Sequence, residues 1–313
     1  MENNDPSWRV DDKTIVVKGI DYPLSLYHLY LLPLLSIRRE HRWFVFEKTH
    51  GACKGLLCKY DKEALELRCT IPDTCTPNYA FHLLGITTYK RVWRRRSHAP
   101  NVLRSSILFD CIKKITIPFS PQDKYYVITA IILSKNTDYY INTLRWMNEL
   151  INKGVVISRS YQVKQFLKIK QRIKKILSRD KEPLIEAAEL LSLKGIGVKS
   201  VQAYLLHAYG LTRYAPIDRY FSEYLRLLGI KGRLPSKKLC IDSRLNCSRC
   251  RYSGECIYAQ VQRLFGDLTG IIQSIIYCLF RTKNTIRRRE NRVEDTLRNF
   301  SEYLEHPSLC LRI

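Results

Sequence analysis

The sequence predicts a mainly α-helical protein with a smaller α+β domain at its N-terminus, and two observations carry this prediction. Over roughly the first 80 residues, short stretches such as Thr14–Lys18 and Trp43–Glu47 alternate or run in β-branched and aromatic residues, as strands do. From about Ser120 the apolar residues recur at helical spacing instead. We therefore expect a β-containing domain over residues 1–100 and a helical domain over residues 101–313.

The N-terminal part also contains a hairpin signal. Leu56–Tyr60 and Leu65–Ile71 are rich in strand-forming residues and could pair across the turn Asp61–Ala64. A basic connector, Lys90–Arg96, follows the strands. We expect it to lead into the helical part.

The helical part is a series of segments with apolar residues three and four positions apart. One of these segments is amphipathic and strongly basic, namely Gln165–Leu177. The expected helices are Asp123–Leu133, Tyr139–Ile151, Gln165–Leu177, Leu184–Leu191, Ser200–Tyr209, Tyr220–Leu228, Gln260–Phe265 and Gly270–Phe280, with a short one near Val293–Leu304.

The charge balance points to a polyanionic partner. The chain has 53 Lys and Arg against 29 Asp and Glu, which gives a net charge of +24 and a pI near 9.7. Each phosphate that Lys or Arg neutralises releases condensed counterions, so the excess favours nucleic acid. An anionic membrane surface, or a charge that serves only solubility, would account for the same excess.

Two kinds of apolar segment are missing from the sequence. It has no uninterrupted apolar run of roughly 18 residues and no apolar stretch behind its acidic start. We therefore expect no membrane association and no signal peptide, and a cytoplasmic location.

Two glycines mark a turn that could hold a phosphate. Residues 191–200 read LSLKGIGVKS and lie between two expected helices. Gly195 and Gly197 leave the backbone uncovered, so N–H groups can approach a phosphate at the start of the next helix. Ile196 would point inward and fix the turn to the core. On this segment alone, a helix–helix connection without any ligand fits equally well.

The wider pattern resembles the base-excision DNA glycosylases that contain a helix-hairpin-helix motif. Three stretches carry the resemblance in the family's order: 132–138 (ILSKNTD), 193–199 (LKGIGVK) and 215–218 (APID). It covers about residues 120–281, roughly half the chain. The resemblance implies the helix-hairpin-helix glycosylase fold, and a monomer that binds double-stranded DNA containing a damaged base. Such a protein would be associated with the nucleoid.

The same resemblance implies that Lys199 and Asp218 are the catalytic residues. Lys199 lies where bifunctional members carry their nucleophile. Its neutral amine can attack C1′ of an extruded nucleotide and form a Schiff base, after which β-elimination nicks the strand. An ionised Asp218 can stabilise the positive charge that develops on the sugar. Taken singly, a phosphate-binding Lys199 and a helix-capping Asp218 are simpler interpretations.

Three further residues are implied to contact DNA or the damaged base. Asn136 stands where relatives insert a Gln into the gap left by the flipped base, although a polar cap at a helix end is equally consistent. Residues 265–273 look like the last helix of the 8-oxoguanine glycosylases, in which a Gln reads the base edge and an aromatic residue stacks on it. Gln273 and Tyr277 match these positions. They could also be ordinary residues of one helix face.

Four of the eleven cysteines form a metal-ligand pattern, C-x6-C-x2-C-x5-C. Four thiolates this close together suit a zinc ion or a 4Fe–4S cluster. The spacing matches the iron–sulfur loop of endonuclease III, so the resemblance implies a 4Fe–4S cluster in residues 240–256. Arg244 and other basic residues of this loop are expected to contact the DNA backbone. The ligands would be Cys240, Cys247, Cys250 and Cys256.

A second group of cysteines falls on the expected strands and turns. A zinc site, buried thiols and disulfides are all consistent with its spacing. The group consists of Cys53, Cys58, Cys69 and Cys75.

These observations together predict a bifunctional DNA glycosylase and AP lyase that removes an oxidised base, with 8-oxoguanine ahead of oxidised pyrimidines. One alternative is a glycosylase of the same fold for mismatched or deaminated bases. The other is a DNA-binding scaffold without enzymatic activity. Lys199 and Asp218 disfavour the scaffold, because a protein that only binds DNA does not need this pair.

Overall fold

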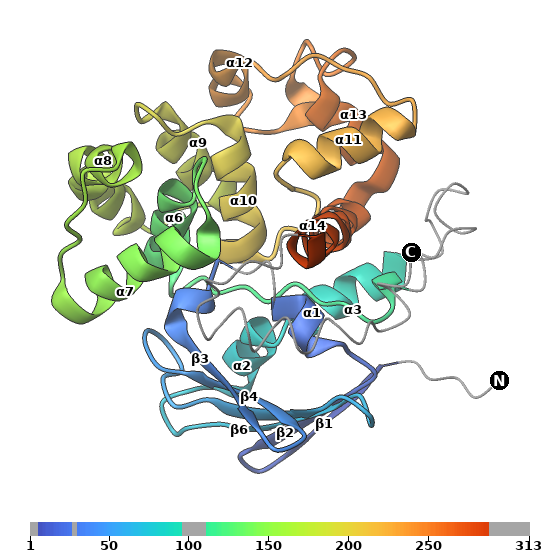
Figure 1. The fold of residues 1–313 in the computed structure, drawn as a ribbon. Coiled ribbons are helices and arrows are strands. Elements are labelled where there is room, and N and C mark those ends of the chain that lie inside the picture. Colours follow the sequence, from blue (N-terminus) through green and yellow to red (C-terminus); the bar gives the residue numbers. More distant parts are fainter. Residues whose placement is uncertain (1–5, 27–29, 96–110, 288–313) are drawn as a thin grey trace.

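The computed structural model describes residues 6–26, 30–95 and 111–287. A six-stranded antiparallel sheet from the N-terminal residues lies at one end, and helices α6 to α14 form the other end, with α1 to α3 between them (Figure 1). The predicted fold class, mainly helical with a smaller α+β part, is confirmed. The predicted domain boundary near residue 100 and the helix near Val293–Leu304 lie outside the described residues.

The sheet has the strand order β1-β2-β6-β5-β4-β3. The predicted β-hairpin is confirmed, since Lys59 of β5 lies opposite Arg68 of β6 in an antiparallel register. The strands β1 and β3 were not expected. Both are edge strands rich in polar residues, so they lack the apolar alternation of a buried strand. The strands are Ser7–Asp11, Thr14–Lys18, Leu35–Glu40, Trp43–Lys48, Leu57–Asp61 and Glu66–Thr70.

The predicted basic connector Lys90–Arg96 is wrong, because residues 90–95 belong to helix α3 (Ile86–Arg95). Ile86, Tyr89 and Val92 recur every three residues and are buried. They bury one face of the helix, while the charged residues occupy the rest of its surface. The basic run concealed this apolar stripe. Two shorter helices, α1 (Tyr22–Leu26) and α2 (Pro77–Leu83), precede α3.

All eight helices expected between residues 123 and 280 are confirmed. The second begins with a π-helical turn, η3 (Tyr139–Thr143), and continues as α7. The short α12 was not expected. The helices are α6 (Lys124–Leu133), α7 (Leu144–Lys153), α8 (Tyr161–Leu177), α9 (Pro183–Ser192), α10 (Val198–Tyr209), α11 (Arg219–Leu227), α12 (Lys237–Asp242), α13 (Ile257–Phe265) and α14 (Thr269–Arg287).

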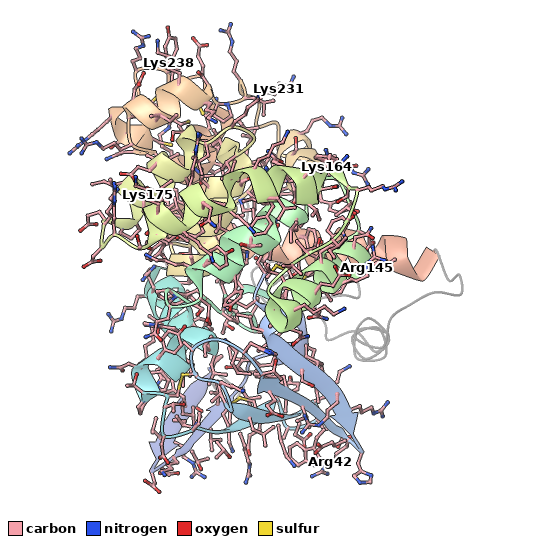
Figure 2. All side chains as sticks on the ribbon, turned by 90° about the vertical axis from the view of Figure 1, so that its left-hand side faces the viewer. Arg42, Arg145, Lys164, Lys175, Lys231 and Lys238 are labelled. Carbon is pink, nitrogen blue, oxygen red and sulfur yellow. A yellow bond between two sulfur atoms is a disulfide. The ribbon has the colours of Figure 1, made fainter. Side chains whose placement is uncertain are left out.

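Helix α8 is the basic amphipathic helix that the sequence predicts. It contains six Lys and Arg residues and no Asp or Glu. Lys164 and Lys175 extend from it on the side of the molecule shown in Figure 2, with Lys231 and Lys238 above them. Basic side chains from α8 and from the segment around α12 therefore project from this side of the helical part. Within the described ranges, no helix is both long enough and apolar enough to span a membrane.

A buried carboxylate fixes α10 against its neighbours. Glu186 of α9 has no exposed surface and accepts hydrogen bonds from the hydroxyls of Tyr204 and Tyr209 on α10. Its other oxygen accepts one from the Lys124 ammonium of α6, at 2.7 Å. A buried polar network with every member paired defines one arrangement of the helices.

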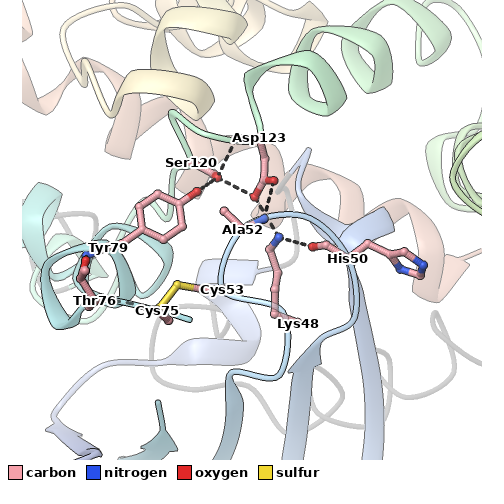
Figure 3. Close-up of a disulfide and its surroundings, with 9 residues drawn as sticks. All are labelled: Lys48, His50, Ala52, Cys53, Cys75, Thr76, Tyr79, Ser120 and Asp123. Carbon is pink, nitrogen blue, oxygen red and sulfur yellow. Dashed lines mark hydrogen bonds and ion pairs between the residues drawn. A yellow bond between two sulfur atoms is a disulfide. The ribbon is translucent and has the colours of Figure 1, made fainter. Parts of the chain in front are cut away.

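The second group of cysteines forms two disulfides. Cys58 and Cys69 lie directly opposite each other on β5 and β6 and are bonded. Cys53 and Cys75 join the loop between β4 and β5 to the segment before α2 (Figure 3). The disulfide alternative is therefore the one the structure shows, and a zinc site formed by these four residues is not.

A buried ion pair connects the sheet to the helical part. The Lys48 ammonium at the end of β4 lies 2.8 Å from the Asp123 carboxylate before α6, and both side chains are at most 2% exposed (Figure 3). Asp123 also accepts from the Ala52 N–H at 3.0 Å and the Ser120 hydroxyl at 2.7 Å. Gly51 has a φ of +77°, and a Cβ there would lie 2.1 Å from Asp123 Oδ1. The loop can therefore reach the carboxylate only with glycine at this position.

The Lys48–Asp123 pair gives the first prediction. Lys48→Met leaves the Asp123 carboxylate buried without its counter-charge, and we expect a loss of about 3–5 kcal/mol in the free energy of unfolding. Lys59→Met is the control, because Lys59 forms an exposed pair with Glu40 and should cost less than about 1 kcal/mol. Urea unfolding measures both. Equal losses for the two variants would contradict the role given to the buried pair.

Candidate active site

A cleft of about 810 Å³ opens in the helical part. Its walls come from the turn after α6, the start of α8, the α9–α10 turn, the segment before α11, and α14. Seven of the residues predicted from the sequence line it: Asn136, Gly195, Gly197, Lys199, Asp218, Gln273 and Tyr277. The fold thus brings together residues from segments that are more than 130 positions apart in the sequence.

The turn between α9 and α10 has the predicted geometry. Ile196 is 1% exposed and points into the core, as expected. Gly195 has a φ of +86°, and a Cβ there would lie 1.3 Å from the Gln165 amide nitrogen. The left-handed backbone therefore favours glycine at position 195, while the Gln165 amide is the movable end of its side chain. We refer to residues 193–197 as the hairpin.

The start of α10 faces open space. Gly197 has an extended backbone and is the N-cap of α10, and no atom lies within 4 Å of where its Cβ would be. The first N–H groups of a helix have no partner within the helix, and the helix dipole favours an anion beside them. A phosphate group can approach here without displacing a side chain.

Lys199 and Asp218 line the cleft from different helices. Lys199 is the second residue of α10 and is exposed. Asp218 is the N-cap of α11, and its Oδ1 accepts from the Phe221 N–H at 2.8 Å. Its Oδ2 accepts from the Gln273 side-chain amide, also at 2.8 Å. The helix-capping interpretation of Asp218 is therefore confirmed, and it leaves the second oxygen beside the cleft.

The surroundings of Asp218 shift its pKa in two opposite directions. Burial raises the pKa of Asp218, and this is the largest effect. The Phe221 N–H, the Lys199 charge and the Gln273 amide all lower it, but the net pKa is above the ordinary value of an Asp. Burial therefore opposes ionisation of this carboxyl, while its hydrogen-bond donors and Lys199 favour it.

Gln273 and Tyr277 lie one turn apart on α14. Gln273 is 5% exposed and uses its amide nitrogen to hold Asp218. Tyr277 is half-buried and contacts the ring of Tyr220 edge-on, with the ring centroids 6.0 Å apart. Both residues are on the wall of the cleft, and the contact between Gln273 and Asp218 was not expected from the sequence.

Asn136 lies in the turn after α6. Its φ is +48°, a left-handed conformation that Asn tolerates better than most residues, and its side chain is exposed at the cleft. The C-cap of α6 is Ser134, and the cap of η3 is Asp138. Asn136 therefore does not occupy either helix-end position.

The four loop cysteines lie beside α10. None of them forms a disulfide, and they line one small cavity together with Val198 and Gln202 of α10. Gln202 is 2% exposed and its Oε1 has no hydrogen-bond partner in the part of the chain that the structure describes. The cysteines are Cys240 in α12, Cys247 in the 3-10 turn Cys247–Arg249, Cys250, and Cys256 before α13.

The environment of the four thiols disfavours their charged form. Burial, together with the neighbouring thiols, raises the pKa of Cys240 to about 12 and that of Cys247 to about 11. Over residues 6–26, 30–95 and 111–287, no three His, Cys, Asp or Glu side chains are arranged to hold a single metal ion. Arg244 is exposed in the same loop and is not among the residues that line the cleft.

Sequence reasoning missed several cleft residues. Tyr30 comes from the N-terminal part and packs its ring edge-on against His207 of α10, with ring centroids 5.2 Å apart. No local pattern marks such a long-range contact. Lys135 lies within the stretch 132–138 that carries the resemblance, but its side-chain contact is visible only in the structure. Tyr161 and Gln165 complete the wall at the start of α8.

No protein-family model and no curated protein sequence matches this chain. Solved structures do match. The 8-oxoguanine glycosylase/lyase of Clostridium acetobutylicum, bound to double-stranded DNA with cytosine opposite 8-oxoguanine, aligns over 90% of this chain and 99% of its own, with a TM-score of 0.57 and 12% identity. Its apo form aligns over 89% and 99%, with a TM-score of 0.56 and 13% identity.

A third structure, of MBOgg1 in complex with a low-affinity DNA ligand, gives a TM-score of 0.55 at 13% identity over 89% of this chain and 99% of that one. At such identities the likeness establishes the fold. The chain therefore has the fold of these helix-hairpin-helix glycosylases along almost its entire length.

Substitution can separate the helix-capping oxygen of Asp218 from the charge of its carboxylate. Asp218→Asn keeps an N-cap oxygen but removes a carboxylate whose pKa burial raises. A raised folded-state pKa means that wild type loses stability as the pH rises from about 3.9. We therefore expect Asp218→Asn to unfold at or above the wild-type temperature at pH 7, with a smaller advantage at pH 4.

Asp218→Ala is the matched comparison. It removes the cap as well, so it should cost about 1 kcal/mol relative to Asp218→Asn. Thermal unfolding at the two pH values measures both variants. If Asp218→Asn is the less stable of the two at pH 7, the account of this carboxyl is wrong.

Proposed function

We propose that this protein is a bifunctional DNA glycosylase and AP lyase that removes an oxidised base from DNA. One observation carries the proposal: the Lys199 amine and the Asp218 carboxyl line the same cleft, beside a helix start that is open to a phosphate. The fold shared with the 8-oxoguanine glycosylase/lyases supports it.

Binding would rest on the positive charge and on the hairpin. A net charge of +24 attracts the DNA backbone, and the N–H groups at the start of α10 would fix one phosphate next to the cleft. The damaged nucleotide would then leave the stack and enter the cleft. Asn136 is exposed at the rim of the cleft, and it would contact the gap that the extruded nucleotide leaves in the duplex.

The chemistry would begin with the neutral Lys199 amine. Its Nζ forms a bond to C1′ while the bond from C1′ to the base breaks, and the base leaves with a proton. Asp218 stabilises the positive charge that develops on the sugar. The C1′–O4′ bond of the sugar then opens as O4′ takes a proton, and the Nζ lone pair forms the C1′=N bond of the Schiff base. This Schiff base loses a C2′ proton, the C3′–O bond breaks with the phosphate as leaving group, and the strand is nicked. Water then hydrolyses the Schiff base and frees Lys199.

Gln273 and Tyr277 would select the base. The Gln273 amide nitrogen is held by Asp218, which orients the side chain toward the cleft. A fixed amide reads donors and acceptors on a base edge, and the Tyr277 ring offers a surface for stacking. These residues support an oxidised purine such as 8-oxoguanine as the substrate.

We further propose that the four loop cysteines hold a 4Fe–4S cluster. They form no disulfide, and they line one cavity together with the buried Gln202 of α10. Each thiolate of such a cluster binds a different iron, so the cysteines need not converge on one ion. The cluster would supply a rigid, redox-capable centre. Cys240, Cys247, Cys250 and Cys256 would be its ligands, and Arg244 would face the DNA backbone. The protein would act on chromosomal DNA as a monomer.

A borohydride-trapping and incision panel tests the proposed activity. The duplexes contain 8-oxoguanine opposite cytosine, thymine glycol, uracil or an abasic site. We expect trapping and incision on 8-oxoguanine and on the abasic site. Lys199→Gln should abolish trapping because it removes the amine, and Asp218→Asn should slow base removal by roughly 10²-fold or more.

Lys153→Gln, at the exposed end of α7, is the control that should keep full activity. Trapping on uracil instead would indicate a glycosylase for deaminated bases. Tight binding without incision or trapping on any duplex would contradict the lyase mechanism and favour a DNA-binding scaffold.

The cluster is tested by its composition. Protein purified without oxygen should contain about four iron and four sulfide ions per chain, and Cys250→Ser should lower both. Cys111→Ala, at a buried cysteine outside the loop, is the control and should leave the iron content unchanged. Stoichiometric zinc with no sulfide would contradict the proposal.

A further inference from the structure

The carbonyl side of the hairpin is held by two lysine side chains. The Lys237 ammonium donates hydrogen bonds to the carbonyl oxygens of Leu193 and Ile196, at 2.9 and 3.1 Å. The Lys135 ammonium donates to the carbonyl oxygen of Gly195. Three backbone acceptors of one short turn are therefore satisfied by two positive charges.

The two lysines come from different parts of the fold. Lys135 lies in the turn after α6, directly before Asn136. Its own carbonyl oxygen accepts from the Tyr161 hydroxyl at 3.0 Å and the Gln162 amide at 2.8 Å, so the turn is fixed to α8. Lys237 is the first residue of α12, in the segment that carries Cys240. The hairpin is thus connected to both flanking segments of the cleft region.

Neither lysine has a carboxylate partner among the described residues. Burial, together with the positive charge of Lys237, lowers the pKa of Lys135 to about 8. Burial also lowers the pKa of Lys237. Two like charges close together without a counter-ion are unfavourable unless other groups compensate. Here the hairpin carbonyl oxygens are the compensating groups.

We propose that Lys135 and Lys237 are positioning residues that hold the hairpin in its phosphate-binding conformation. Oxygen atoms of backbone carbonyls are also ligands for hard cations, so the two ammonium groups occupy positions that a bound metal ion could otherwise fill. With these carbonyl oxygens held, the N–H groups at the start of α10 would keep their position beside a bound phosphate. The DNA-binding consequence rests on the proposed function, whereas the effect on hairpin rigidity does not.

The first experiment measures the free protein. Hydrogen exchange of the backbone amides at residues 193–199 is compared in wild type, Lys135→Met, Lys237→Met and Lys238→Met. Lys238 is the exposed neighbour of Lys237 on α12 and is the matched control. We expect faster exchange at these amides in the first two variants and no change in Lys238→Met. Unchanged exchange in both Lys135→Met and Lys237→Met would overturn the proposal.

The second experiment measures affinity for a duplex containing a tetrahydrofuran abasic analogue at several salt concentrations. Lys237→Met should weaken binding about tenfold or more, because it leaves two hairpin carbonyl oxygens without their charged donor. The salt dependence should stay unchanged, since Lys237 touches the hairpin and not a phosphate. Calcium at constant ionic strength should restore part of the affinity in Lys237→Met and have no such effect on wild type.

A salt slope reduced by about one unit in Lys237→Met would overturn the positioning role, because that is the signature of a lost phosphate contact. If wild type binds none of the duplexes, the proposed function fails. The exchange experiment then still decides whether the lysines hold the hairpin.

Discussion

The close approach of the hairpin to α8 is the constraint on which the candidate site depends. Gly195 has a left-handed φ of +86° and lies next to the Gln165 side chain, and the buried Ile196 fixes the same turn to the core. These two contacts determine where α10 begins and therefore where its second residue, Lys199, stands. Behind the turn, the fully paired Glu186 network keeps α10 from shifting against α9 and α6. The Lys199 amine is thus placed by backbone conformation, core packing and buried hydrogen bonds.

Asp218 shows how a helix cap can hold a carboxyl group at the cleft. Its Oδ1 caps α11, so the carboxyl cannot rotate away without loss of a helix cap, and its Oδ2 is held by Gln273 at the cleft. The sheet contributes at a distance: the buried Lys48–Asp123 pair fixes the start of α6, and the turn at the end of α6 carries Lys135 and Asn136. The N-terminal part is therefore a support for the cleft rather than a separate unit beside it.

Local signals were predictable from the sequence, and long-range partners were not. The hairpin, Lys199, Asp218 and the basic α8 each follow from residues close together in the chain. Contacts such as Lys237 with Ile196, or Tyr30 with His207, join distant segments and leave no local pattern. Four cysteines allow three pairings, so the Cys53–Cys75 and Cys58–Cys69 bonds could not be deduced from spacing. Helix α3 was missed because the basic residues among its apolar positions conceal the helical spacing. Strands β1 and β3 were missed because edge strands rich in polar residues lack an apolar alternation.

The most direct test of the account is to identify the lysine that becomes bonded to DNA. Two lysines of the described part of the chain line the cleft, Lys199 and Lys135, and of these Lys199 stands at the open start of α10. Wild-type protein would be trapped with borohydride on a duplex containing an abasic site, digested, and the modified peptide sequenced by mass spectrometry. The account predicts a sugar adduct on Lys199 alone. An adduct on Lys135, or on a lysine outside the cleft, would contradict it.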